Sequence, residues 1–163
     1  FAGGGAVKFV KDYDAAGLKK SIPLVGSGFL TDGTLEAQGA SAQGLITALH
    51  YGDNIETPRN TAFRNKFAVT YKVHPDVYAL QGYDAAQMLA IGLATVKGDL
   101  SKKDALYAAM NKAQIDSPRG KFTLSPQRNP TQDFYVREVK GNYNVVTGVA
   151  VKALADPGRG CKP

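Results

Sequence analysis

Two glycine-rich stretches are the places where residue types and spacing could form a ligand-binding loop. Gly3-Gly4-Gly5 and Gly26-Ser27-Gly28 each follow a short apolar stretch, where a dinucleotide-binding loop would lie. Neither completes the pattern G-x-G-x-x-G, because Lys8 and Thr31 occupy the position of the third glycine. The two loops therefore do not predict a nucleotide site.

The remaining polar candidates do not assemble a catalytic or metal site. His50 and His74 are far apart in the sequence, with no carboxylate or cysteine at ligand spacing. Asp84 stands alone in an apolar stretch. It could be a tuned acid or base, but an acceptor for backbone or hydroxyl groups is the favoured interpretation. No nucleophile, base and oxyanion hole come together, so the sequence predicts neither an enzyme nor a bound cofactor.

Composition is typical of a globular α/β domain. The 163 residues are 44% hydrophobic and 21% charged, and the net charge of +6 is scattered without interleaved aromatics. That distribution argues against a nucleic-acid groove. The single cysteine, Cys161, excludes a disulfide within the chain. Because the chain begins with Phe1-Ala2, which suggests the end of a strand, we expect it to be the C-terminal part of a longer polypeptide.

Residues 77–96 form the element around which the chain is organised. The stretch carries one formal charge, Asp84, and has apolar or small side chains on every helical face. A helix of this kind must be buried on most sides. Its polar side chains lie in the N-terminal half and it lacks an aromatic belt, so a packed helix is favoured over a membrane span.

The other patterns alternate strands with helices. A helix follows Gly3-Gly4-Gly5, which we expect to be a turn, and short strands at residues 22–25 and 44–51 flank a further helix. The order strand, helix, strand from Phe1-Ala2 to residues 22–25 predicts a βαβ unit, which favours a parallel sheet covered by helices. Further helices are expected after Thr57-Pro58, with Phe63, Phe67 and Tyr71 on one face, and after a capping box at Ser101 and Asp104; a hairpin is expected over residues 134–140 and 143–149.

The sequence resembles the C-terminal half of the type I periplasmic binding proteins, specifically the leucine/isoleucine/valine-binding group that serves ABC importers. The stretches that carry this resemblance, in order, are FAGGGAVKFVKDYDAAGL, IPLVGSGFLTDGTLEAQGASAQGLITALHYG, FRNKFAVTYKVHPDVYALQGYDAAQML, SPRGKFTLSP and FYVREVKGNY. Together they cover essentially the whole chain.

The resemblance implies an α/β fold with two Rossmann-like lobes of parallel strands, joined by crossovers, with the ligand between them. Residues 1–53 would then belong to the second lobe and residues 54–133 to the first. Residues 134–163, the hairpin and the tail, would return to the second lobe. The rest of each lobe would lie outside this chain, so we expect the stretch alone not to form a stable two-lobed protein.

The resemblance also implies site residues. Ala2 and Gly3 correspond to the second-lobe loop that lies against the ligand, and Tyr78 corresponds to a first-lobe aromatic that touches it. Gly28 or Phe29 falls where amino-acid binders place a carboxylate for the ligand's ammonium group. Because neither residue is acidic, an aromatic or aliphatic carboxylate is expected as ligand rather than an α-amino acid. Cys161 resembles a cysteine that in some relatives bridges to an earlier part of the chain; a free thiol is the alternative.

These implications define the expected function. The first interpretation is a non-enzymatic, extracytoplasmic or periplasmic receptor that traps a small organic ligand by hinge closure and presents it to the membrane permease of an ABC importer. The alternatives are a ligand-sensing domain of a signalling protein, and an α/β enzyme whose catalytic residues lie in the missing half. Neither a metal nor a nucleic acid is expected as a partner.

Overall fold

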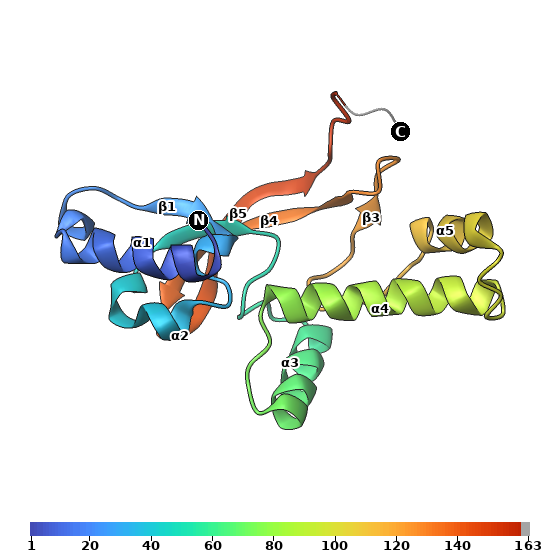
Figure 1. Cartoon of the computed structure of the whole chain (residues 1–163), viewed down its shortest axis with the longest axis horizontal. Helices are drawn as coiled ribbons and strands as arrows, with labels where there is room; N and C mark the ends of the chain where they lie inside the picture. Colours follow the sequence, from blue (N-terminus) through green and yellow to red (C-terminus); the bar gives the residue numbers. More distant parts are fainter. Residues whose placement is uncertain (161–163) are drawn as a thin grey trace. The chain divides into compact units, whose positions relative to one another are not determined.

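The computed structural model describes residues 1–160 (Figure 1), so the interpretations of Cys161 lie outside the described residues. The chain divides into two compact units. The first comprises Phe1–Ile55 and Asp133–Lys152, and the second comprises Glu56–Gln132 with the described residues that follow Lys152. Each unit is described by itself.

Helices in the first unit begin at the N-terminus of the chain. α1 (Gly3–Ala15) is followed by the 3-10 turns η1 (Leu18–Lys20) and η2 (Gly28–Leu30), then by α2 (Leu35–Gln38) and the 3-10 turn η3 (Gly39–Ala42). The expected turn at the triple glycine is wrong, because Gly3, Gly4 and Gly5 form the first turn of α1. Ala2 is the N-cap with an extended backbone and belongs to no strand.

The sheet of this unit is mixed. β1 (Val25–Ser27) runs parallel to β2 (Ile46–Leu49), in agreement with the predicted parallel sheet, whereas β2 pairs antiparallel with β4 (Pro130–Lys140). Phe1 and Ala2 belong to no strand, so the predicted βαβ unit lacks its first strand. β4 in turn pairs with β5 (Tyr143–Leu154), which confirms the predicted hairpin. β1 starts later than expected, after Pro23, whose missing N–H disfavours a ladder position.

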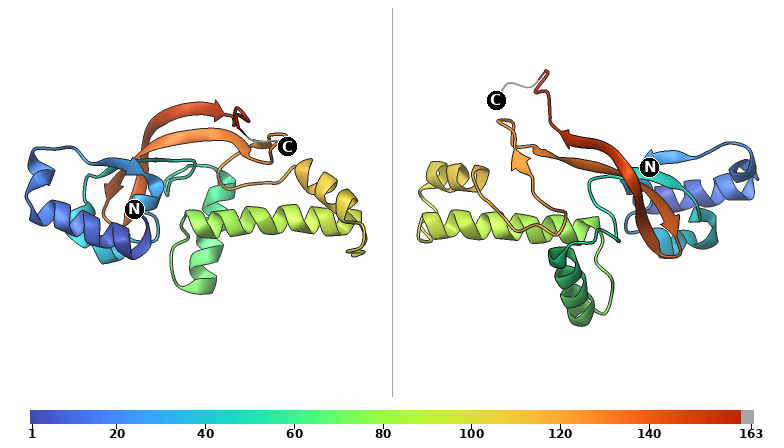
Figure 2. Two further views of the ribbon diagram at one scale, coloured as in Figure 1. Left: turned by 45° about the horizontal axis from the view of Figure 1, so that its top comes forward. Right: turned by 180° about the vertical axis from the view of Figure 1, so that it is seen from behind.

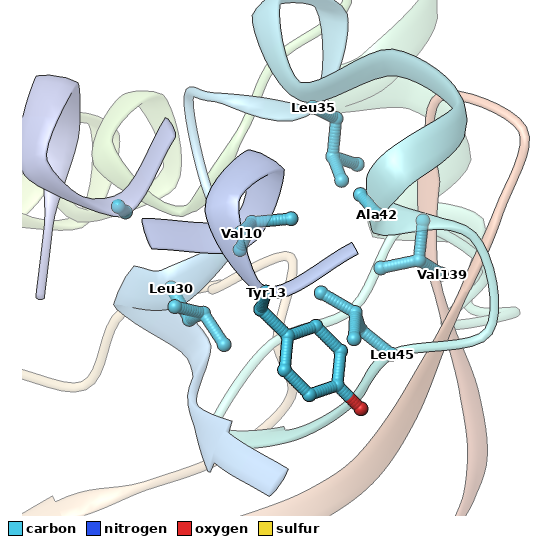
Figure 3. Packing of buried hydrophobic residues seen from close by; sticks show 8 residues of the cluster. Val10, Tyr13, Leu30, Leu35, Ala42, Leu45 and Val139 are labelled. Atoms are coloured by element: carbon cyan, nitrogen blue, oxygen red, sulfur yellow. The ribbon is translucent and has the colours of Figure 1, made fainter. Parts of the chain in front are cut away.

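The hydrophobic core of the first unit lies between α1 and the sheet (Figure 3). Val10 and Tyr13 of α1 pack there with Leu30, Leu45 and other buried side chains from the loops and β4. The Tyr13 hydroxyl donates to the carbonyl of Ile22, so the polar end of this buried ring is satisfied.

The second unit is mainly helical. It contains α3 (Pro58–Tyr71), α4 (Val77–Thr95), α5 (Lys103–Asn111) and the short strand β3 (Thr123–Leu124), which pairs with the start of β4. Figure 2 shows α5 running alongside the C-terminal half of α4. The side chains of Thr57 and Asp76 cap α3 and α4, and Pro58 occupies the first turn of α3 as expected.

Two expectations about these helices need correction. Ser101 does not cap α5, whose N-cap is Lys102; the Ser101 hydroxyl instead donates to Asp99. α4 is confirmed as a helix, but within its unit it is not buried all round, since Tyr78 and Leu89 are 47% and 45% exposed. In the described part of the chain, no helix has the length and apolarity needed to cross a membrane.

Candidate ligand-binding site

The loop after β1 is the best-defined part of the candidate site. β1 ends at Ser27, and η2 begins immediately with Gly28, which is buried, and Phe29, which is 37% exposed. The Gly28 carbonyl accepts hydrogen bonds from the backbone N–H groups of Thr31 and Asp32, at 3.0 and 2.9 Å. Gly28, Phe29 and Asp32 therefore belong to one tight turn.

A fully buried arginine lies beneath this turn. Arg137 of β4 donates from Nη2 to Asp32 Oδ2 at 2.6 Å and from Nη1 to the Tyr51 carbonyl at 2.9 Å. Its Nε and Nη2 also donate to the Thr47 hydroxyl, at 3.2 and 3.1 Å. Arg137 and Thr47 have no exposed surface, and Asp32 is 5% exposed. A buried charge is tolerated only when paired and hydrogen-bonded, and this one is both.

Gly28 is required for space. A Cβ atom at position 28 would lie 2.5 Å from Arg137 Nη2 and 2.6 Å from Leu49 Cβ, closer than atoms approach in folded proteins. Gly28 is not among the glycines with positive φ, so backbone conformation does not demand glycine here. The space that a carboxylate side chain at this position would need is already occupied by Arg137 and Leu49.

A second set of buried bonds holds the other side of the turn. The Thr31 hydroxyl donates to Asn144 Oδ1 at 2.6 Å, and Asn144 N–H donates to Asp53 Oδ2 at 2.7 Å. The Leu30 carbonyl accepts from Gln38 Nε2 at 2.8 Å. Strands β4 and β5 and helix α2 thus all hold the turn that carries Phe29.

The structure divides the expected site residues between the two units. Ala2, Gly3, Gly28 and Phe29 lie in the first unit, where α1 packs against η2. Ala2 and Gly3 are exposed at the start of α1, whose first turn holds no acidic residue. The exposed backbone N–H groups at this positive helix end are compatible with an anionic ligand. Tyr78 lies in the second unit, in the first turn of α4.

The second unit has a buried ion pair of its own. Arg119 Nε lies 3.0 Å from Asp84 Oδ2, and the Ser117 hydroxyl donates to the same oxygen at 2.8 Å. Burial raises the pKa of Asp84, whereas the hydrogen bond from Ser117 and the charge of Arg119 oppose the rise. Asp84 therefore accepts from a hydroxyl group, as the favoured interpretation expects, and it anchors the loop before β3 to α4.

Neither histidine joins a metal site. His50 is buried, with its ring 6.0 Å from Phe134 in an edge-on arrangement, and His74 lies in the loop between α3 and α4. Residues 1–160 contain no group of three or more histidine, cysteine or acidic side chains that could hold a metal ion.

Sequence reasoning missed Asp32 and Arg137. They are 105 residues apart, and neither belongs to a recognisable spacing pattern. The one available signal is the position of Arg137 inside a predicted strand. If that strand is buried in the sheet, the arginine is buried with it and requires an acidic partner.

Comparison with known proteins supplies the family. The sequence profile described as periplasmic binding protein matches residues 1–144. The chain belongs to this family. Leu/Ile/Val-binding protein homolog 6 of Brucella abortus is 33% identical over 138 residues, which are 80% of this chain and 35% of that relative. The chain thus spans about a third of the length of the curated relatives that it matches, and the sequence resemblance is confirmed.

Solved structures agree in fold. A solute-binding protein of an ABC transporter from R. palustris, in complex with benzoate, is 50% identical with a TM-score of 0.94, over 100% of this chain and 45% of that one. A second from Rhodopseudomonas palustris HaA2, in complex with p-hydroxybenzoic acid, is 27% identical with a TM-score of 0.86, over 98% and 45% of the two chains. A leucine-binding protein from Thermotoga maritima, 18% identical with a TM-score of 0.70 over 89% and 41% of the two chains, shares the fold.

These similarities establish the class of the chain. It is a partial region of an α/β periplasmic binding protein of type I, and its family and structural neighbours are solute-binding proteins rather than enzymes.

Proposed function

We propose that this chain is part of an extracytoplasmic solute-binding protein that binds an aromatic carboxylate of the benzoate class for an ABC importer. The similarity to the benzoate-bound R. palustris protein, at 50% identity over the whole chain, supports this proposal. Two further similar proteins were solved with hydroxybenzoates, at 27% and 29% identity.

The observation that carries the choice of ligand is the turn at Gly28. An α-amino acid needs a counter-ion for its ammonium group, because a buried unpaired charge is costly. Position 28 has no room for an acidic side chain, and Phe29 is apolar. Asp32, the acid that follows in the same turn, is paired with Arg137. These features favour an anionic ligand with an apolar ring over a zwitterion.

The proposed site includes Ala2, Gly3, Gly28, Phe29 and Tyr78, and the ligand would be trapped between two lobes. Residues 1–53 and 134–163 would contribute to one lobe and residues 54–133 to the other. In the full receptor, hinge closure around the ligand would present the closed form to the membrane permease of the importer. The family is that of periplasmic binding proteins, which supports an extracytoplasmic location.

The test is titration calorimetry on the full-length receptor with benzoate, 4-hydroxybenzoate and L-leucine. We expect one molecule of a benzoate-class acid to bind per protein and to be recovered unchanged. Tight binding of leucine without binding of either aromatic acid would contradict the proposal, and so would conversion of the ligand into a product.

A further inference from the structure

The turn that carries Phe29 is held by the buried guanidinium group of Arg137. Gly28 O accepts from the N–H groups of Thr31 and Asp32, so the Asp32 backbone cannot shift without moving Gly28 and Phe29. The Asp32 carboxylate is in turn bonded to Arg137 Nη2 at 2.6 Å. The position of Phe29 is thereby linked to the position of the guanidinium group.

Arg137 itself is fixed by the sheet. Its Cα pairs with that of Thr47 in the antiparallel ladder of β2 and β4, and its side chain bonds back to the Thr47 hydroxyl. A further bond to the Tyr51 carbonyl fixes the direction of the planar guanidinium. All of these donors and acceptors belong to a single compact unit.

We propose that Asp32 and Arg137 are positioning residues for ligand recognition, which hold the Gly28–Phe29 turn at the distance from the sheet that an aromatic carboxylate requires. This inference rests on the proposed function. Neither residue touches the ligand. The pair acts by fixing the position of Phe29, and Arg137 occupies the space that a side chain at position 28 would need.

The test compares two matched double substitutions in the full-length receptor. Asp32→Leu with Arg137→Met removes the pair without leaving a buried charge, a replacement that folded proteins commonly tolerate. Asp84→Leu with Arg119→Met makes the same exchange in the buried ion pair of the second unit, which we do not place in the ligand site. The double substitution Asp32→Asn with Arg137→Gln also removes both charges but keeps polar side chains, and it replaces the first double variant should that variant fail to fold.

Three measurements report on the turn. Amide hydrogen exchange of residues 28–34 in the unliganded protein measures how firmly the turn is held. Calorimetry gives the Kd for benzoate. A tryptophan reporter, Phe29→Trp, introduced into each background gives the change in emission on benzoate addition, measured as the difference from the same background with Phe29 retained; the 163 residues contain no tryptophan of their own.

We expect faster exchange at residues 28–34 and benzoate binding weaker by at least about tenfold when the Asp32–Arg137 pair is replaced. The reporter should also lose its response to benzoate in this background, whereas the control double variant should retain all three properties. A folded protein without the pair that binds benzoate as the wild type does would overturn the inference, even if exchange is faster. If the wild-type receptor binds no aromatic acid, the proposed function fails and the inference fails with it. If amide hydrogen exchange at residues 28–34 is unchanged when the pair is replaced, the role of the pair in holding the turn is refuted separately.

Discussion

At Gly28, a single added methyl group is expected to disturb the protein. Gly28→Ala would place Cβ against Arg137 Nη2 and Leu49, so the turn or the guanidinium must shift. Overpacking of this kind costs about 1–3 kcal/mol of the free energy of unfolding. Urea denaturation of the full-length receptor measures the loss.

The matched control for this prediction is Gly148→Ala in β5. A Cβ at Gly148 would meet no atom within 4 Å, so this substitution should leave the free energy of unfolding within about 0.5 kcal/mol of wild type. Equal effects of the two alanine substitutions would show that position 28 has room for a side chain, contrary to the geometry.

Asp99 offers a pH prediction at an exposed site. Hydrogen bonds from the Ser101 hydroxyl and backbone N–H, followed by one from Lys102, lower the pKa of Asp99. Stabilisation by a group of this kind is present above the unfolded pKa and disappears as pH falls through the folded value. Ser101→Ala should therefore raise the pKa of Asp99 towards the ordinary value of an aspartate, as measured by an NMR titration of the carboxyl carbon.

Ser101→Thr keeps the hydroxyl group and serves as the control. It should leave the Asp99 titration close to that of wild type. A low pKa of Asp99 that survives Ser101→Ala would assign the effect to the backbone N–H of residue 101 and to Lys102.

Single residues also mark the limit of sequence reasoning. Gly28 and Phe29 could be proposed as site residues because a family resemblance assigns that position. The sequence did not reveal that Arg137 and Leu49 fill the space beside Gly28. Asp32 lies in the turn that follows η2 and Arg137 lies on β4, and the pairing of β1 with β2 and of β2 with β4 brings them together. Contacts of such sequence separation leave no local pattern.

Among the elements, the contact of α4 with α5 depends on Gly92. A Cβ there would lie 2.8 Å from Met110 Cγ and 3.3 Å from the Leu106 carbonyl. Gly92→Val should destabilise the full-length receptor by about 1–3 kcal/mol, because the helices must separate or Met110 must move. Met110→Ala in the same protein should recover part of that loss, a coupling that a double-mutant cycle in urea measures.

Gly82→Val tests whether the effect belongs to the interface. Gly82 lies on the same helix, and a Cβ there would meet no atom of α5 or of the rest of this chain within 4 Å. If Gly92→Val and Gly82→Val cost the same, or if Met110→Ala recovers nothing, close approach of α4 and α5 is not the cause.

Helices with strong local signals were predictable, and their ends were less so. Thr57-Pro58 and Asp76 mark the starts of α3 and α4 because their capping chemistry is local. The triple glycine was misjudged, since glycine favours turns by propensity but here Gly3, Gly4 and Gly5 form the exposed first turn of α1, ahead of the buried Ala6. Ser101 was wrongly predicted to cap α5, because its hydroxyl group donates to Asp99 instead.

For the whole molecule, we predict that the 163-residue chain alone unfolds without a cooperative transition. It spans 45% of the benzoate-bound protein, and α4, which is apolar on every face, leaves large side chains such as Leu89 exposed. Exposed apolar surface should bind the dye ANS strongly. Urea titration and ANS fluorescence of the isolated chain, beside the full-length receptor, provide the comparison.

Cooperative unfolding of the isolated chain, with little ANS fluorescence, would contradict this prediction. It would mean that the described units bury their own apolar surfaces.

The sequence alone supports the fold class, through its alternation of strands and helices. The mixed sheet could not be predicted in this way, because it depends on β4, whose partner β2 lies far earlier in the chain.

The pairing of β2 with β4 also governs the order in which this stretch can fold during synthesis. Residues 46–49 leave the ribosome long before residues 135–138, their partners in the ladder. Until then β2 presents an open edge and Asp32 lacks its cation, whereas α3, α4 and α5 have already emerged. The helical unit can therefore begin to fold while the first unit waits, and closing so long a loop makes completion of the sheet slow. The Gly28–Phe29 turn of the proposed ligand site would be among the last features of the nascent protein to form.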